Sequence, residues 1–183
     1  MQKRLILDSN LLDITIRRLC QQLIENHDDF SGSVILGLQP RGVFLADRIK
    51  QKLQEITQKE VPTGYLDATF HRDDFRRRDN PIKAKATDVP FLLEDKKVIL
   101  VDDVLFTGRT VRAALDAMLA FGRPGMVELL ILINRKYSRD FPIEPNYIGK
   151  SVNTIQSQRV HVEWKEQGAK EDSIWLVTKE IDS

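Results

Sequence analysis

Two adjacent carboxylates, Asp102 and Asp103, follow an apolar run at residues 97–101, past the middle of the 183-residue chain. Paired carboxylates can accept hydrogen bonds from two neighbouring sugar hydroxyls, or hold them through Mg²⁺. The sequence Thr107-Gly108-Arg109-Thr110 then opens an expected helix, whose first N–H groups and dipole favour a phosphate. Gly108 permits close backbone approach, and the threonine hydroxyls add donors. Residues 102–110 are therefore suited to a sugar that carries a 5′-phosphate.

Each part of this segment also has a simpler explanation. An Asp-Asp pair often only ends a strand, and Thr107 alone can cap a helix. The order of a buried strand, an acid pair and Thr-Gly-Arg-Thr at a helix start is rarer, and it favours a binding site. Neither the dinucleotide-binding string G-x-G-x-x-G nor the P-loop string G-x-x-x-x-G-K-[ST] occurs. Response-regulator receiver domains also use paired acids, but after their first strand.

Apolar periodicity predicts the elements that position these residues. Asp8 or Ser9 can cap a first helix, and apolar runs at 33–38, 62–69, 97–101 and 127–133 predict strands. Residues 159–163 and 173–179 predict a C-terminal hairpin. The helices between the strands have inward faces made of Leu12, Ile16, Leu19 and Leu23, then Leu45, Ile49, Leu53 and Ile56, and within 110–121 Val111, Leu115 and Met118. This alternation predicts an α/β fold with a doubly wound, mainly parallel sheet flanked by helices.

Ligands of such sheets lie beyond the carboxyl ends of the strands, where loops at 39–42, 71–90 and 102–110 are expected. Pro40-Arg41-Gly42 interrupts the chain directly after a buried strand, which favours a functional Arg41 over an ordinary solvated arginine. Residues 71–90 are polar and strongly charged, so we expect a mobile functional loop or a projecting arm of two strands. Within that stretch Arg72 is favoured as functional. Arg76, Arg77 and Arg78, which belong to the same basic cluster as Lys83 and Lys85, are expected to form a solvated face.

The composition indicates one globular domain over residues 1–183. Charged residues make up 30% of the chain and the net charge is +1, so the overall charge does not indicate a nucleic-acid-binding protein. The single cysteine, Cys20, excludes an intramolecular disulfide, and the three histidines have no zinc-binding spacing. The sequence identifies no partner for His27 or His161. Because no apolar run suits a signal peptide or a membrane span, we expect a cytoplasmic protein without a membrane partner.

The segment 98–114 resembles the phosphoribosyl pyrophosphate (PRPP) signature of type I phosphoribosyltransferases. It is most similar to that of the PyrR family, the bifunctional pyrimidine-operon attenuators and uracil phosphoribosyltransferases. The similarity covers almost the whole chain and extends to Gly122-Arg123-Pro124, His71-Arg72-Asp73-Asp74, Tyr147-Ile148-Gly149-Lys150 and Ser157. It implies a parallel sheet flanked by helices, a flexible loop at about 71–90, and a small hood built from about 135–158 and the C-terminal hairpin.

The resemblance also implies a reaction, in which uracil N1 displaces pyrophosphate from C1′ of PRPP. Mg²⁺ would be bound through PRPP, with Asp102 and Asp103 as candidate ligands. Pro40 and Arg41 belong to the loop that would bind pyrophosphate, and catalytic roles fall to Arg41, Arg72 and Asp103. The ribose hydroxyls would meet the two aspartates, and the 5′-phosphate would meet residues 107–110. The full set of implied PRPP-binding residues is Asp102, Asp103, Val104, Leu105, Phe106, Thr107, Gly108, Arg109 and Thr110.

Two residues, Arg135 and Val160, match positions near the nucleotide base in the family. The family has Asp-Arg-Gly where this chain has Asn134-Arg135-Lys136, and one extra residue stands before Asp140. Arg135 therefore keeps its place while its neighbours differ. For Val160, a core position in a strand is an equally good explanation.

The resemblance implies a regulatory role as well, because PyrR proteins bind a stem-loop of pyr leader mRNA in the presence of UMP or UTP. The family uses a basic face at a dimer interface, which implies a homodimer or larger homo-oligomer. The matching candidates are Arg17, Arg18, Lys150 and Arg159, whereas Glu144 and Gln21 replace basic or histidine residues of the family. Three functions stay open: an enzyme that also binds RNA, a uracil phosphoribosyltransferase without an RNA role, and a nucleotide-sensing regulator with negligible catalysis.

Overall fold

The computed structural model describes residues 2–73, 86–136 and 139–178. Its main sheet contains five parallel strands in the order β3-β2-β4-β5-β6, and a second sheet contains three antiparallel strands in the order β1-β8-β7. The main strands are β2 (Ser33–Leu38), β3 (Thr63–Leu66), β4 (Lys97–Leu105), β5 (Met126–Arg135) and β6 (Tyr147–Val152). The small sheet is built from β1 (Gln2–Leu7), β7 (Gln158–Glu163) and β8 (Ser173–Thr178).

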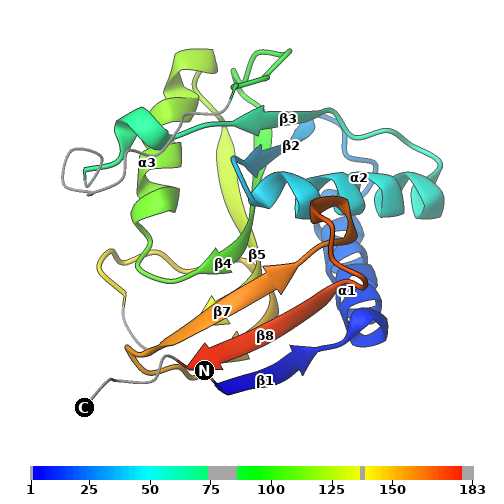
Figure 1. Ribbon diagram of the computed structural model, residues 1–183. Coiled ribbons are helices and arrows are strands. Elements are labelled where there is room, and N and C mark those ends of the chain that lie inside the picture. The colour runs from blue at the N-terminus through cyan, green and yellow to red at the C-terminus, as the bar shows by residue number, and fades with distance from the viewer. Residues whose placement is uncertain (1, 74–85, 137–138, 179–183) are drawn as a thin grey trace.

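Helices cover both faces of the main sheet, as predicted for a doubly wound fold. Figure 1 shows α3 (Arg109–Met118) on one side, and α1 (Ser9–His27) and α2 (Gly42–Thr57) on the other. The small sheet packs on the same side as α1 and α2. Three short 3₁₀ helices complete the described structure: η1 (Thr69–His71), η2 (Leu119–Phe121) and η3 (Lys165–Gln167). Among the described residues, no helix combines the length and apolar character needed to cross a membrane.

The apolar runs of β2 and β4 follow from burial on both faces. In β4, Ile99 and Val101 join the core under α1 and α2, while Val98 and Leu100 join the core under α3. Successive side chains of a strand point to opposite faces, so a strand that is covered twice needs apolar residues at every position. The two carboxylates near the end of β4 therefore interrupt a strand that is otherwise apolar from Val98 to Leu105.

The order of the strands creates a crevice at their carboxyl ends. From β2 the chain passes through α2 to the edge strand β3, whereas from β4 it passes through α3 to β5 on the opposite side. The connections of the neighbouring strands β2 and β4 thus diverge to opposite faces of the sheet. Such a switch point is where doubly wound sheets bind their ligands.

Several elements differ from the sequence-based expectation. The strand predicted at 62–69 is limited to β3, and η1 follows it. Ile56 and Leu115, both expected inside, are 42% and 38% exposed. In α3 the predicted Val111 and Met118 are buried, and the rest of the buried face is formed by small residues, Ala113, Ala114 and Ala117, which allow the helix to lie close to the sheet. The expected loop at 71–90 lies largely outside the described residues, since 74–85 are not described.

The hood expected from residues 135–158 and the C-terminal hairpin is divided between the two sheets. Tyr147–Val152 is the edge strand β6 of the main sheet, because it pairs in parallel with β5. The small sheet instead gains the N-terminal strand β1, whose Leu5 pairs with Trp175 of β8. Neither β1 nor β6 was expected, since both are short and mix polar with apolar residues. The predicted C-terminal hairpin is present as β7 and β8.

A polar cluster joins the end of α1 to the beginnings of β2, β5 and β6. His27, at the end of α1, contacts Ser33 Oγ through Nδ1 at 2.8 Å and Glu128 Oε2 through Nε2 at 2.7 Å. The Tyr147 hydroxyl donates to the same Glu128 oxygen at 2.8 Å and accepts from Asn26 at 2.9 Å. Buried polar groups require such partners, so this cluster fixes α1 against β2, β5 and β6.

Candidate active site

Asp102 and Asp103 lie inside β4, which continues to Leu105 instead of ending at residue 101. The strand is longer than predicted because β5 pairs with it as far as Leu105 and Asn134. The loop expected at 102–110 is accordingly reduced to residues 106–108. Both aspartates are buried, with 8% and 5% of their surface exposed.

The environment of the acid pair disfavours the ionisation of both carboxyl groups at once. The N–H of Asp103 donates to Asp102 Oδ1 at 2.9 Å. Burial first, and then the neighbouring Asp103 carboxylate, raise the pKa of Asp102 well above its ordinary value of 3.8. Arg41 acts in the opposite direction, because its positive charge favours the ionised carboxylate. The pair is therefore suited to accept hydrogen bonds from a ligand that brings donors or positive charge.

Arg41, directly before α2, links the acid pair to the small sheet. Its Nε donates to Asp103 Oδ2 at 2.8 Å, and Nη2 donates to the carbonyl of Val162 in β7 at 2.6 Å. The arginine predicted to be functional is therefore bonded to Asp103 at the carboxyl end of the sheet.

Gly42 brings the arginine loop against β4. A Cβ atom at this position would lie 2.5 Å from the carbonyl oxygen of Val101 and 3.0 Å from Cα of Asp102. Both neighbours are backbone atoms, so a side chain at residue 42 would force the loop and the strand apart. The glycine is thus required for the close approach of Arg41 to Asp103.

The short loop at 106–108 leads into α3 and borders a cavity of about 390 Å³. Gly108 has a φ of 88°, a left-handed conformation that glycine adopts without strain. The N–H of Arg109 donates to Thr107 Oγ1 at 3.3 Å. The next N–H groups of α3 have no acceptor within the helix, so they are available to an anion. The cavity is lined by Arg72, Asp102, Val104, Leu105, Phe106, Thr107, Gly108, Arg109, Thr110 and Val111.

A second cavity of about 310 Å³ adjoins the first and contains the arginine loop. Both cavities are lined by Arg72, Asp102, Val104 and Thr110, so they form one continuous cleft. Arg72 Nη1 donates to the Thr110 hydroxyl at 2.7 Å, which places the residue at the junction. The second cavity is also lined by Gln39, Pro40, Arg41, Ala68, Thr69 and Asp103. The structure therefore brings together the candidates from three separate parts of the sequence.

The two residues expected near a base do not line this cleft. Arg135 is only 6% exposed and donates to Thr154 Oγ1 at 3.0 Å and to the Gln158 carbonyl at 2.8 Å. Its guanidinium carbon lies 3.7 Å from the centre of the Phe106 ring, so Arg135 contacts the cleft only through Phe106. Val160 is half-buried and packs against the core under α1 and α2.

Arg139 and Asp140 are neighbours of the loop at 106–108 that the sequence did not indicate. Arg139 donates to the Phe106 carbonyl at 2.6 Å and to Asn134 Oδ1 at 2.8 Å. Asp140 accepts from Arg109 Nε at 3.0 Å. Arg109 also pairs with Asp73. Only the charge of these residues was visible in the sequence, and a charged loop residue is most often solvated.

The four RNA candidates occupy two regions. Arg17 is exposed on α1 and paired with Asp13 at 2.7 Å. The neighbouring Arg18 donates to the carbonyls of Ile148 and Gly149 in β6, which places it beside the exposed Lys150. Arg159 is exposed on β7 in the small sheet, and among the described residues no hydrogen bond joins it to the other three.

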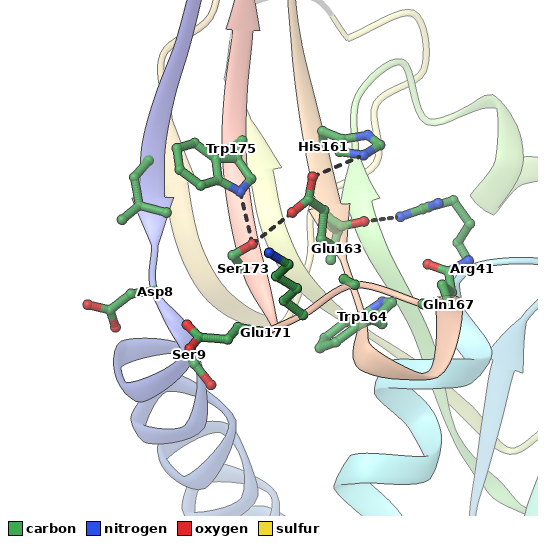
Figure 2. A pocket seen from close by; sticks show the side chains of 15 residues that line it. Asp8, Ser9, Arg41, His161, Glu163, Trp164, Gln167, Glu171, Ser173 and Trp175 are labelled. Carbon is green, nitrogen blue, oxygen red and sulfur yellow. Dashed lines mark hydrogen bonds and ion pairs between the residues drawn. The ribbon is translucent and has the colours of Figure 1, made fainter.

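A larger cavity of about 790 Å³ lies beside the small sheet. Figure 2 shows Trp175, Ser173, Glu163 and His161 along one wall, with Arg41 at the far end. The Trp175 indole donates to Ser173 Oγ at 2.9 Å, and Ser173 donates to Glu163 at 3.1 Å. These three side chains are thus bonded to one another. The smaller cleft, which contains the loop at 106–108 and the acid pair, is the better candidate for chemistry.

The raised pKa of Asp102 predicts how the stability of the protein depends on pH. An acid with a raised pKa in the folded state binds more protons there than in the unfolded chain, so stability falls as pH rises from 3.8 through the folded pKa. Asp102→Asn removes this loss. We expect the variant to gain stability relative to the unaltered protein as pH rises, in urea unfolding at pH 4 to 8.

The matched control for that comparison is Asp116→Asn, because Asp116 is exposed on α3. Its free energy of unfolding should follow that of the unaltered protein at every pH. A stability difference for Asp102→Asn that stays constant or shrinks with rising pH would contradict the assigned environment.

Comparison with known proteins identifies the family. The profile of the family described as "Phosphoribosyl transferase domain" matches residues 5–167. A protein of Elusimicrobium minutum named Bifunctional protein PyrR is 39% identical over 180 residues, which cover 98% of this chain and 99% of that protein. A protein of Desulfosudis oleivorans with the same name is 42% identical over 163 residues, covering 88% and 90%.

Solved structures show the same architecture at much lower identity. The HGPRT-ase of Leishmania tarentolae in complex with GMP has a TM-score of 0.73 and 14% identity, with 97% of each chain covered. A hypoxanthine phosphoribosyltransferase of Staphylococcus aureus has a TM-score of 0.69 and 16% identity, covering 93% of this chain and 90% of that one. These similarities show the fold alone. Because the PyrR relatives are far more similar and extend over nearly the full length, this chain belongs to the PyrR family of phosphoribosyltransferases.

Proposed function

We propose that this protein transfers the phosphoribosyl group of PRPP to N1 of uracil, forming UMP and pyrophosphate. We propose further that it regulates pyrimidine biosynthesis in the cytoplasm by binding pyr leader mRNA when UMP or UTP is bound. The observation that carries the enzymatic part is the continuous cleft, in which the phosphate loop, the acid pair and Arg41 lie together. Membership of the PyrR family supports the regulatory part.

The shape of the cleft suggests how PRPP lies in it. The cavity at residues 106–110 would take the 5′-phosphate, because the first N–H groups of α3 point there. Asp102, which lines both cavities, would accept hydrogen bonds from the ribose hydroxyls together with Asp103. The pyrophosphate would then extend toward Pro40, Arg41 and Arg72 in the second cavity.

In the reaction, uracil N1 bonds to C1′ while the C1′–O bond to pyrophosphate breaks, and the N1 proton is released. Positive charge develops on the ribose ring, and negative charge develops on the leaving oxygen. Asp103, Arg41 and Arg72 all line the second cavity. The Asp103 carboxylate would stabilise the positive charge and the two arginines the negative charge, so these three residues are the proposed catalytic groups. Arg41 would have to exchange Asp103 for pyrophosphate, since the two side chains are bonded at 2.8 Å.

Mg²⁺ would enter with PRPP and not as a resident ion. Over the described part of the chain, no cluster of three His, Cys, Asp or Glu side chains could hold a metal by itself. Asp102 and Asp103 offer oxygen ligands, which suits an ion that keeps most of its waters and its phosphate ligands. When bound, the ion would neutralise charge on the pyrophosphate.

Two alternatives share the cleft but differ in outcome. A uracil phosphoribosyltransferase without an RNA role is favoured by the exposed Glu144 and by the separation of Arg159 from the other basic candidates. A nucleotide-sensing regulator with negligible catalysis is favoured by Asn134 and Lys136, which depart from the family's loop. Turnover tests the second alternative, and RNA binding tests the first.

The enzymatic proposal is tested by pyrophosphate release from PRPP and Mg²⁺ with each nucleobase in turn. We expect release with uracil, and a loss of about 100-fold or more in the double variant Asp102→Asn/Asp103→Asn, because the ribose hydroxyls lose their charged acceptors. Asp116→Asn, the same substitution on the exposed face of α3, should keep full activity. If no nucleobase gave pyrophosphate release, the nucleotide-sensing regulator would be favoured. If only purines gave release, the substrate would be a purine and not uracil.

The regulatory proposal is tested by the salt dependence of binding to a pyr leader stem-loop in the presence of UMP. If Arg18 and Lys150 each contact a phosphate, Arg18→Gln and Lys150→Gln should each weaken binding and lower the slope of log K against log salt by about 1. Arg123→Gln, an exposed arginine elsewhere, should leave the slope unchanged. Equal affinity for the leader and a scrambled hairpin would favour the enzyme without an RNA role.

A further inference from the structure

Residues 139–141 run along the outer side of the phosphate loop and bond to its carbonyl groups. Arg139 Nη1 donates to the Phe106 carbonyl at 2.6 Å. The N–H groups of Asp140 and Phe141 both donate to the Thr107 carbonyl, at 2.9 and 3.1 Å. Two consecutive carbonyls of the loop are therefore turned toward this segment.

Because these carbonyl groups are fixed, the geometry of the peptide bond also fixes the direction in which the N–H groups of the loop point. In a trans peptide the carbonyl of one residue and the N–H of the next point to opposite sides. The only cis peptide in the described chain is Gln39–Pro40, so the peptides after Phe106 and Thr107 are trans. The N–H groups of Thr107 and Gly108 must then point away from residues 139–141. Both residues line the cavity in which the 5′-phosphate would lie, and none of residues 139–141 lines it.

Arg139 is itself held in place from the end of β5. Its Nη2 donates at 2.8 Å to Oδ1 of Asn134, a residue only 4% exposed. Arg135, which follows Asn134 in the chain, stacks on the Phe106 ring, with its guanidinium carbon 3.7 Å from the ring centre. Phe106 is thus fixed at its carbonyl by one arginine and at its ring by another. The orientation of the peptide after Phe106 depends on Arg139, since among the described residues no other hydrogen bond to its carbonyl is found.

We propose that Arg139 is a positioning residue for the 5′-phosphate: it fixes the peptide between Phe106 and Thr107 so that the Thr107 N–H faces the phosphate. The inference rests on the proposed function only in taking this cavity as the 5′-phosphate site. It assigns a role to a residue that does not line the cleft. Loss of Arg139 should weaken ligands that carry a 5′-phosphate and spare ligands of the pyrophosphate end.

The test is calorimetric titration with UMP and, separately, with inorganic pyrophosphate and Mg²⁺. Arg139→Gln should lower UMP affinity about tenfold, because a donor to a charged group is misdirected. Its affinity for pyrophosphate should stay within about twofold of the unaltered protein, since Arg41 and Arg72 are untouched. Arg139→Lys retains one donor and should recover most of the loss in UMP affinity. Arg123→Gln is the control for removing an exposed arginine.

Each result has a distinct meaning. Unchanged UMP affinity in Arg139→Gln would overturn the inference and leave the proposed function standing. An equal loss for UMP and pyrophosphate, with no recovery in Arg139→Lys, would show a general structural role and also overturn it. If the unaltered protein bound no UMP, both the proposed function and this inference would fail. A selective loss for UMP that lysine recovers would support the assignment.

Discussion

The end of β4 contains two buried carboxylates, whose burial costs free energy. The surrounding groups of the cleft supply the hydrogen bonds and positive charge that offset this cost. Asp102 and Asp103 are neighbours in the strand, and both line the cavity that contains the arginine loop. Asp103 receives Arg41 from the start of α2, and Asp102 receives the N–H of Asp103. Asp102 remains short of positive charge, which is the condition under which a ligand's hydroxyls or a metal-bearing substrate would be favoured.

The doubly wound topology explains why the arginine and the phosphate loop are both available to that pair. β2 and β4 are neighbours, and their connections leave for opposite faces, so the Arg41 loop arrives from one side and the 106–108 loop from the other. Gly42 permits the first approach, and Gly108 permits the turn into α3. Arg41 also bonds to Val162, so the small sheet is connected to the cleft by the same side chain that would contact pyrophosphate.

Much of this arrangement could be predicted from the sequence, for physical reasons that differ by element. β2, which is buried on both faces, has a continuous apolar run and was predicted with its observed limits. Leu115 was placed inside by spacing alone, whereas the alanines of α3 decide which face meets the sheet. β1 and β6 exist only through their pairing with β8 and β5, and pairing leaves little trace in a short mixed segment. Arg139 acts on Phe106 across 33 residues of sequence, a contact that no local pattern indicates.

The central claim is that one cleft holds a 5′-phosphate at the start of α3 and a pyrophosphate at Arg41, with the acid pair between them. The most direct test is a competition titration of ribose 5-phosphate and Mg²⁺-pyrophosphate, separately and together, against PRPP. The account predicts that the two fragments bind at the same time and that PRPP displaces both. Mutual exclusion of the two fragments, or displacement of only one by PRPP, would contradict it.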